Sequence, residues 1–182
     1  MKSFYFTAFL MAMILILGCH KDEPAKISEF ISGKEIPTQE SWNSTIVFTD
    51  SGNTRAILQT AHLRMYSLSQ TTLLDTSVKI DFYGRDSKKS STLTSKRGKV
   101  DDKNRNLYAY ENVVVKNDSG VVVETSELMW ENTKQKIMTD KFVTITTPTE
   151  KIQGYGFESD QFIRNYIIRR ITYVTNSTSF DK

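Results

Sequence analysis

The sequence is poor in the residues on which most enzyme and metal sites depend. It contains 1 cysteine and 2 histidines among 182 residues. No His and Cys residues have the spacing of metal ligands, and a lone cysteine cannot form a disulfide within the chain. The GxSxG, P-loop and GxGxxG motifs are absent as well. We therefore predict that the protein is not an enzyme and needs neither a metal nor a cofactor.

Three short features resemble chemical sites, but each has a simpler explanation. Gly154-Tyr155-Gly156 lacks a following helix whose free amides would bind phosphate, so a close backbone approach in a strand explains these glycines better. Asp101-Asp102 lies in an evident turn, which argues against paired-carboxylate catalysis. His62 fits a strand position that faces solvent or is hydrogen-bonded better than it fits a catalytic base.

The chain carries only a small excess of positive charge. The formal net charge of +3 does not imply binding to nucleic acid. One basic cluster stands out in the predicted last strand and consists of Arg164, Arg169 and Arg170. Such charges can protect an exposed strand edge from aggregation. The alternative is contact between their guanidinium groups and phosphates, which bidentate hydrogen bonding suits.

Long hydrophobic runs are scarce, and a strong one lies at the N-terminus. The run from Phe4 to Leu17 is too short for a bilayer span, which needs about 20 residues. It ends in Ile16-Leu17-Gly18-Cys19, which resembles a bacterial lipobox. We therefore predict that 1–18 is a lipoprotein signal peptide, cleaved after Gly18, and that Cys19 carries the lipid. The alternatives are an ordinary secretory signal with a chance cysteine and a short membrane anchor.

The lipidated N-terminus and the following residues, 19–41, are predicted to form a flexible tether. This segment has two prolines, mixed charges and few apolar residues. Acyl chains would hold the protein at a membrane face, at about 0.8 kcal/mol per buried methylene. Lys21-Asp22-Glu23 is similar to a surface-export signal of Bacteroidetes lipoproteins, so the sequence leaves open which membrane carries the anchor.

The rest of the chain contains an internal repeat of about 30–35 residues. One strand of each unit carries apolar residues on a single face, because side chains alternate between faces along a strand. Its members are Val78 and Ile80, then Leu107, Val113 and Val115, then Ile137, Val143 and Ile145.

The other strand of each unit has an odd spacing between its apolar residues. The pairs are Leu58/Leu63, Leu93/Gly98, Val123/Leu128 and Ile152/Phe157. A flat strand needs an even spacing to keep both members on one face. We therefore predict a bulge or corner in each of these strands, which turns the strand while keeping its apolar side inward.

These patterns predict an all-β domain over residues 42–174. We expect a twisted, slightly open β-jelly-roll, a solenoid-like stack of antiparallel strands with an apolar interior and two ends. The predicted last strand is Asp160–Val174, and 175–182 is expected to be a frayed tail.

The chain resembles the LptC family, the membrane-anchored periplasmic component of the lipopolysaccharide export machine, in a Bacteroidetes-like lipoprotein form. The resemblance spans about residues 37–172 and rests on Asn106-Leu107-Tyr108-Ala109, Asn112-Val113-Val114-Val115, Glu124-Thr125, Leu128-Met129-Trp130, Thr139-Asp140-Lys141-Phe142-Val143 and Gly154-Tyr155-Gly156-Phe157-Glu158-Ser159-Asp160. Related shuttle and outer-membrane domains share this OstA/LptA-type fold, and the N-terminal anchor favours LptC. The chain departs from the enterobacterial pattern because a lipobox replaces the transmembrane helix.

The resemblance implies a lipid carrier at the periplasmic face of the inner membrane. It would receive lipopolysaccharide from the inner-membrane ABC transporter complex and pass it to a periplasmic LptA-like protein by strand-edge pairing. The candidate residues for the acyl-chain groove are Leu63, Met65, Leu107, Val113, Val115, Leu128, Trp130, Val143, Ile145 and Phe157. The same residues would look alike in a closed sandwich core. The alternative function is an outer-membrane or surface-exposed β-stack lipoprotein that binds glycan or protein.

Overall fold

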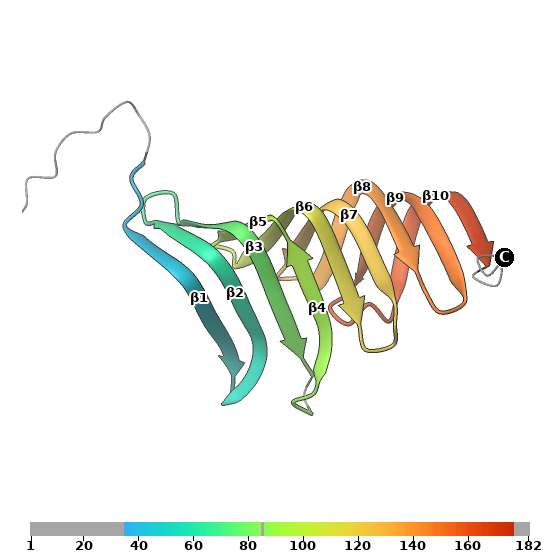
Figure 1. Ribbon diagram of the computed structural model, residues 1–182, viewed down its shortest axis with the longest axis horizontal. Coiled ribbons are helices and arrows are strands. Elements are labelled where there is room, and N and C mark those ends of the chain that lie inside the picture. Colours follow the sequence, from blue (N-terminus) through green and yellow to red (C-terminus); the bar gives the residue numbers. More distant parts are fainter. Residues whose placement is uncertain (1–34, 85, 177–182) are drawn as a thin grey trace, which may run out of the picture. The chain divides into compact units, whose positions relative to one another are not determined.

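The computed structural model describes residues 35–84 and 86–176. The predicted signal peptide, Cys19, most of the tether and most of the tail lie outside these residues. The described residues form one 10-stranded antiparallel sheet without helices (Figure 1). The strands are β1 (Gln39–Asp50), β2 (Asn53–Tyr66), β3 (Thr71–Tyr83), β4 (Lys89–Ser95), β5 (Arg97–Asp101), β6 (Asn106–Asn117), β7 (Val122–Glu131), β8 (Lys136–Thr146), β9 (Glu150–Asp160) and β10 (Tyr166–Asn176).

The strands follow one another in sequence order across the sheet, as the predicted stack requires. The strands β4 and β5 are the two halves of one bent strand, interrupted at Lys96, and both halves lie between β3 and β6. β1 already begins at Gln39, inside the segment predicted as a tether. No helix in the described part of the chain is long and apolar enough to cross a bilayer.

Each repeat unit bends at a corner, which confirms the bulge or corner predicted from the odd spacing of its apolar residues. The register between β2 and β3 shifts at Thr60/His62, between two buried residues, Leu58 and Leu63. A side-chain hydroxyl stabilises three of the corners by donating to the carbonyl two residues later. The bonds are Thr60 Oγ1 to His62 O at 3.2 Å, Ser95 Oγ to Arg97 O at 3.0 Å and Thr125 Oγ1 to Glu127 O at 3.4 Å.

The fourth corner has a glycine at the position of this hydroxyl residue. A Cβ atom on Gly154 would lie 2.4 Å from the carbonyl oxygen of Arg170 on β10. Only a residue without a side chain admits this close approach. The structure thus agrees with the predicted reason for this glycine.

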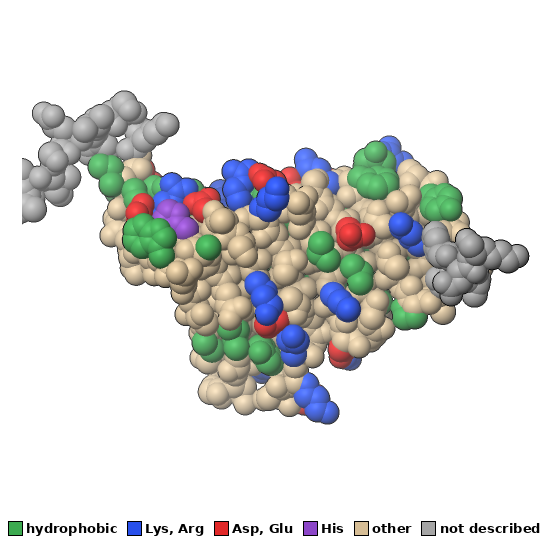
Figure 2. Space-filling model, viewed as in Figure 1, with side chains coloured by type: hydrophobic (Ala, Val, Ile, Leu, Met, Phe, Trp, Pro, Cys, Tyr) green, Lys and Arg blue, Asp and Glu red, His purple; other side chains and the backbone are tan. Residues whose placement is uncertain are grey.

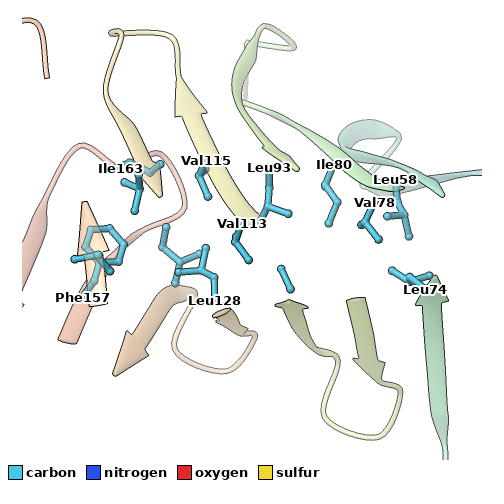
Figure 3. Close-up of a cluster of buried hydrophobic side chains, with 14 of the residues drawn as sticks. Leu58, Leu74, Val78, Ile80, Leu93, Val113, Val115, Leu128, Phe157 and Ile163 are labelled. Atoms are coloured by element: carbon cyan, nitrogen blue, oxygen red, sulfur yellow. The ribbon is translucent and has the colours of Figure 1, made fainter. Parts of the chain in front are cut away.

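The corners fold the sheet into two facing layers, which we call the β4 layer and the β5 layer after the strands they contain (Figure 1). Apolar side chains form continuous cross-strand rows on the inward faces. One row of the β4 layer runs through Ile46, Leu58, Ile80, Leu93, Val115, Val123, Ile145, Ile152 and Val174. A row of the β5 layer runs through Leu63, Leu74, Gly98, Ala109 and Leu128. Figure 3 shows side chains of both rows pointing into the space between the layers.

The predicted last strand, Asp160–Val174, is wrong at its start. β9 extends to Asp160, and a loop over 161–165 precedes β10. The carboxylate of Asp160 accepts hydrogen bonds from the backbone N–H groups of Phe162 at 2.8 Å and Arg164 at 3.3 Å. This local competition for backbone donors ends the strand and starts a turn. Arg164 consequently lies in the loop and not in a strand.

Candidate functional site

The candidate site is the apolar interior between the two layers. Seven of the ten predicted groove residues are at most 4% exposed, namely Leu63, Val113, Val115, Leu128, Val143, Ile145 and Phe157. Leu107 and Trp130 are half-buried and pack against this cluster, and Met65 is exposed at the start of the stack. The structure therefore brings nine of the ten together, and the side chains of the seven buried residues fill space between the layers.

The N-terminal end of this interior is incompletely covered. A further row of the β4 layer pairs Phe48 with Ala56 and Ala56 with Phe82. Phe48 follows Ile46 on the inward face, yet it is 47% exposed. We call Ile46, Phe48, Ala56 and Phe82 the β1–β3 shelf. On the opposite face of β1, Val47 is 53% exposed, and Figure 2 shows hydrophobic side chains on the visible face over the lower ends of β1–β3. The shelf offers an apolar surface that is continuous with the buried rows.

The β9–β10 loop covers the interior where the last hairpin faces β4 and β6. Ile163 is 1% exposed and belongs to the buried cluster, although it lies in a turn between Phe162 and Arg164. In Figure 3 its side chain lies in the same apolar space as Phe157 and Val115. The sequence does not reveal that Ile163 is a buried loop residue, because its pattern predicts a strand over Asp160–Val174.

Three hydrogen bonds connect this loop to the opposite layer. Asn117 Nδ2 donates to the carbonyl oxygens of Phe162 at 3.1 Å and Ile163 at 3.4 Å. Ser91 Oγ donates to the carbonyl oxygen of Gln161 at 3.3 Å. Asn117 and Ser91 are paired neighbours of the β4 layer. No local sequence pattern indicates this role, because Asn117 lies 45 and 46 residues from the two carbonyl groups that it bonds.

A surface cavity of about 570 Å³ lies beside the loop. It is lined by Lys136, Glu158, Ser159, Asp160, Arg164, Asn165, Tyr166 and Ile167. Lys136 forms an ion pair with Glu158, and this hydrogen bond lowers the pKa of the Glu158 carboxyl. Burial raises the pKa of the Tyr166 phenol, with a smaller contribution from Glu150, so this group stays neutral. The cavity therefore combines two cations with a neutral phenol and two carboxylates.

The three arginines predicted as a cluster have three different sets of partners. Arg164 forms an ion pair with Asp118 at 3.5 Å. Arg169 forms one with Asp140 at 2.7 Å. Arg170 lies over the ring of Tyr155, with 4.5 Å between its guanidinium carbon and the ring centroid. Each charge thus already has a neighbour that balances it or stacks on it.

His62 and Asp101, which were considered as catalytic residues, make contacts that stabilise the fold. The ring of His62 stacks on Trp42 with 5.2 Å between centroids. The carboxylate of Asp101 accepts hydrogen bonds within its own turn, and the bonds from Asn104 lower its pKa most. No three His, Cys, Asp or Glu side chains among residues 35–84 and 86–176 come together as metal ligands.

Both ends of the sheet present strands with one unpaired edge. Within the described residues, β1 pairs with β2 and β10 pairs with β9, and neither has a second neighbour. β10 also exposes large apolar side chains, namely Ile167, Ile171, Tyr173 and Val174. Such edges have free backbone donors and acceptors that can pair with another strand.

Comparison with known proteins identifies the family. A search of curated proteins found no match. The family model described as "Lipopolysaccharide-assembly, LptC-related" matches residues 6–162. The match covers most of the chain and includes β1–β9. Membership indicates a periplasmic, inner-membrane-associated location. The chain belongs to the LptC-related family and therefore acts in lipopolysaccharide transport and assembly.

Proposed function

We propose that this protein is the lipid-anchored periplasmic component that receives lipopolysaccharide from the inner-membrane ABC transporter and passes it along a β-jelly-roll bridge toward the outer membrane. The observation that carries this proposal is the set of apolar rows that run through the stack from β1 to β10. Acyl chains in water cost about 25 cal/mol per Å² of apolar surface. A carrier for them needs a continuous apolar path, and these rows form one.

Lipid binding requires the two layers to separate, because the protein's own side chains fill the interior. The ten groove residues named from the sequence would then exchange contacts with each other for contacts with acyl chains. Since both kinds of contact are apolar, the exchange has a small net free energy. The β1–β3 shelf is the natural first contact, since Phe48 is already half-exposed. Acyl chains bound there would continue into the row that contains Leu58 and Ile80.

The free edges supply the connections to partners. An unpaired strand can add the strand of a neighbouring domain, which gives β-augmentation with backbone hydrogen bonds. We assign one edge to the transporter complex and the other to an LptA-like protein. The exposed apolar residues of β10 would add side-chain contacts to this pairing. Co-purification of the full chain with the inner-membrane ATPase complex tests the first connection.

The lipid anchor in this proposal is inferred from the sequence alone, since Cys19 lies outside the described residues. Labelling cells with radioactive palmitate should mark the full chain, and Cys19→Ser should remove the label. Retention of the label in Cys19→Ser would contradict the lipobox.

Phosphate groups of the lipid are proposed to meet the cations at the C-terminal end. Arg164 and Lys136 line the same cavity. Their ion pairs with Asp118 and Glu158 are exposed, and such pairs are weak enough to exchange for a phosphate. Arg169 and Arg170 remain candidates for phosphate contact or edge protection.

Photo-crosslinking tests the interior as the binding site. Phe48 and Val47 are neighbours on β1 that face opposite sides of the sheet, and they are 47% and 53% exposed. Replacing Phe48 with p-benzoylphenylalanine in the full chain should give an adduct with purified lipopolysaccharide. The same probe at Val47 should give little adduct and is the matched control. No adduct at Phe48, or equal adducts at both positions, would contradict the proposal.

The second candidate function is a surface lipoprotein that binds glycan or protein, which Lys21-Asp22-Glu23 favours. Protease treatment of intact cells separates the two functions. Digestion of the full-length protein on intact cells would favour the surface location, and protection would favour the periplasmic one.

A further inference from the structure

The β9–β10 loop, residues 161–165, is built differently from the other hairpin turns because it carries a buried apolar residue. Several of its polar groups form hydrogen bonds within the hairpin itself. Asp160 accepts from the backbone of Phe162 and Arg164, and Ser159 Oγ donates to the carbonyl oxygen of Asn165 at 2.8 Å. Ile163 alone points the other way and is 1% exposed. The loop thus inserts a single side chain into the end of the apolar interior.

The backbone of Ile163 is in an unfavourable conformation. Its φ angle is +53°, in the left-handed region that β-branched residues avoid. Such a conformation persists only where surrounding contacts hold it. Here the contacts are the burial of the side chain and the hydrogen bond from Asn117 to the Ile163 carbonyl. Once these contacts are lost, the loop is expected to relax rather than to stay inserted.

The loop also joins the two layers that lipid binding must separate. It follows Ser159 and precedes Tyr166, which are paired residues in the β5 layer. Its hydrogen bonds reach Asn117 and Ser91 in the β4 layer. At the other end of the stack, the β1–β3 shelf leaves Phe48 half-exposed. A strained loop at the last hairpin therefore covers part of the interior, whereas Phe48 at the first hairpin is half-exposed.

We propose that the β9–β10 loop is a displaceable plug, in which Ile163 occupies the end of the interior that an acyl chain of lipopolysaccharide takes when lipid is bound. This inference rests on the proposed lipid-carrier function. An arriving acyl chain replaces the apolar contacts of Ile163, the strained backbone relaxes, and the bonds to Asn117 and Ser91 break. Loss of these bonds then frees the two layers to separate at the C-terminal end.

Hydrogen exchange on the wild-type full chain tests the plug without any substitution. The amides of Phe162, Ile163 and Arg164 are hydrogen-bonded to Asp160 in the closed loop. Adding lipopolysaccharide should accelerate exchange of a peptide that contains 160–165, while strands that contact lipid become slower. Unchanged or slower exchange in this peptide, with an adduct at the Phe48 probe, would overturn the plug and leave the carrier function intact.

Two substitutions should release the plug by independent routes. Asn117→Asp keeps the oxygen that accepts from Ser119 and Val121 but removes the amide donor to the loop. Ile163→Gly removes the inserted side chain and allows the positive φ without strain. Each variant should take up fluorescein-labelled lipopolysaccharide about tenfold faster, as expected for losing one or two hydrogen bonds or a buried contact.

The matched control for the amide-to-acid change is Asn104→Asp. Asn104 is exposed and bonded to Asp101 in the turn between β5 and β6, so its uptake rate should equal that of the wild type. Equal or slower uptake by folded Asn117→Asp and Ile163→Gly would overturn the plug. If the wild type and both variants take up no lipid and the Phe48 probe gives no adduct, the carrier function fails and the plug with it.

Discussion

The first and the last hairpin of the stack leave the apolar interior covered to different degrees. At the N-terminal end, β1–β3 carry an inward row that continues past the opposite layer, and Phe48 is 47% exposed. At the last hairpin, between β9 and β10, a five-residue loop turns inward and buries Ile163 to 1% exposure. Strand periodicity therefore determines which face is apolar, and the connections determine where that face is accessible.

The corners show the same contrast on a smaller scale. Thr60 forms the first corner with a hydroxyl that bonds the backbone two residues later. Gly154 occupies the equivalent position in the last corner, where β10 leaves no room for a side chain. The backbones of β9 and β10 therefore approach each other closely at this last corner.

The largest expected effect comes from placing a charge in the middle of the interior, compared with a charge on the β1–β3 shelf. Val115→Asp puts a carboxylate into a site that is 3% exposed and offers it no cation, so it should lower the free energy of unfolding by about 3–5 kcal/mol. Phe48→Asp should cost about 1–2 kcal/mol, because half of this side chain is already in water. Urea denaturation of both variants measures the difference. A cost for Phe48→Asp that equals or exceeds the cost for Val115→Asp would show that the shelf is buried.

A smaller effect is expected from a methyl group added at the last corner. Gly154→Ala would place Cβ at 2.4 Å from Arg170 O and 2.8 Å from Ile168 Cγ2, so β10 must shift. The expected cost is about 1–3 kcal/mol, with faster hydrogen exchange in β10. Thr60→Ala at the first corner is the comparison and should cost about 1 kcal/mol through its lost hydrogen bond, without any effect on β10. Unchanged exchange in β10 of Gly154→Ala would contradict the close contact.

The interior and the corners, which these two predictions test, could both be predicted from the sequence. The repeated pairs such as Leu58/Leu63 predicted both the inward face and the corners, because strand geometry depends only on local alternation. Val78, Val113 and Val143 predicted the repeat itself, and all three are buried.

The closure of the C-terminal end was not predictable in the same way. Ile163 is held by Asn117, 46 residues away, and no local pattern announces such a contact. Its positive φ is also atypical of isoleucine, so residue preferences point to a strand instead. The predicted placement of Arg164 in the last strand is wrong for a related reason, since the turn at Asp160 separates it from β10, which carries Arg169 and Arg170.

The smallest expected effect concerns acid stability and should appear mainly in the N-terminal half. Burial raises the pKa of the Asp81 carboxyl, but hydrogen bonds from Thr92 and Lys79 and the charge of Lys89 lower it more. The net pKa therefore lies below the ordinary value of 3.8. A depressed folded-state pKa gives stability above the ordinary value, and this stability is lost as the pH falls through the folded-state pKa.

Thermal unfolding at several pH values measures this contribution. Asp81→Asn should flatten the acid limb of the stability profile below about pH 4. The pKa of Glu158 is also lowered, first by its hydrogen bond from Lys136, but this carboxyl is solvent-exposed and screened. Glu158→Gln should therefore change the acid limb less than Asp81→Asn does. The reverse order would place the acid-sensitive group at the C-terminal end.

The central claim is that lipopolysaccharide travels through the apolar interior between the layers. Proteoliposomes that contain the inner-membrane ABC transporter complex and the full chain, with p-benzoylphenylalanine at position 48 or 47, test it most directly. With ATP, the adduct at the Phe48 position should increase while the adduct at the Val47 position stays low. An adduct that does not depend on ATP, or one that forms equally at both positions, would contradict transport through the interior.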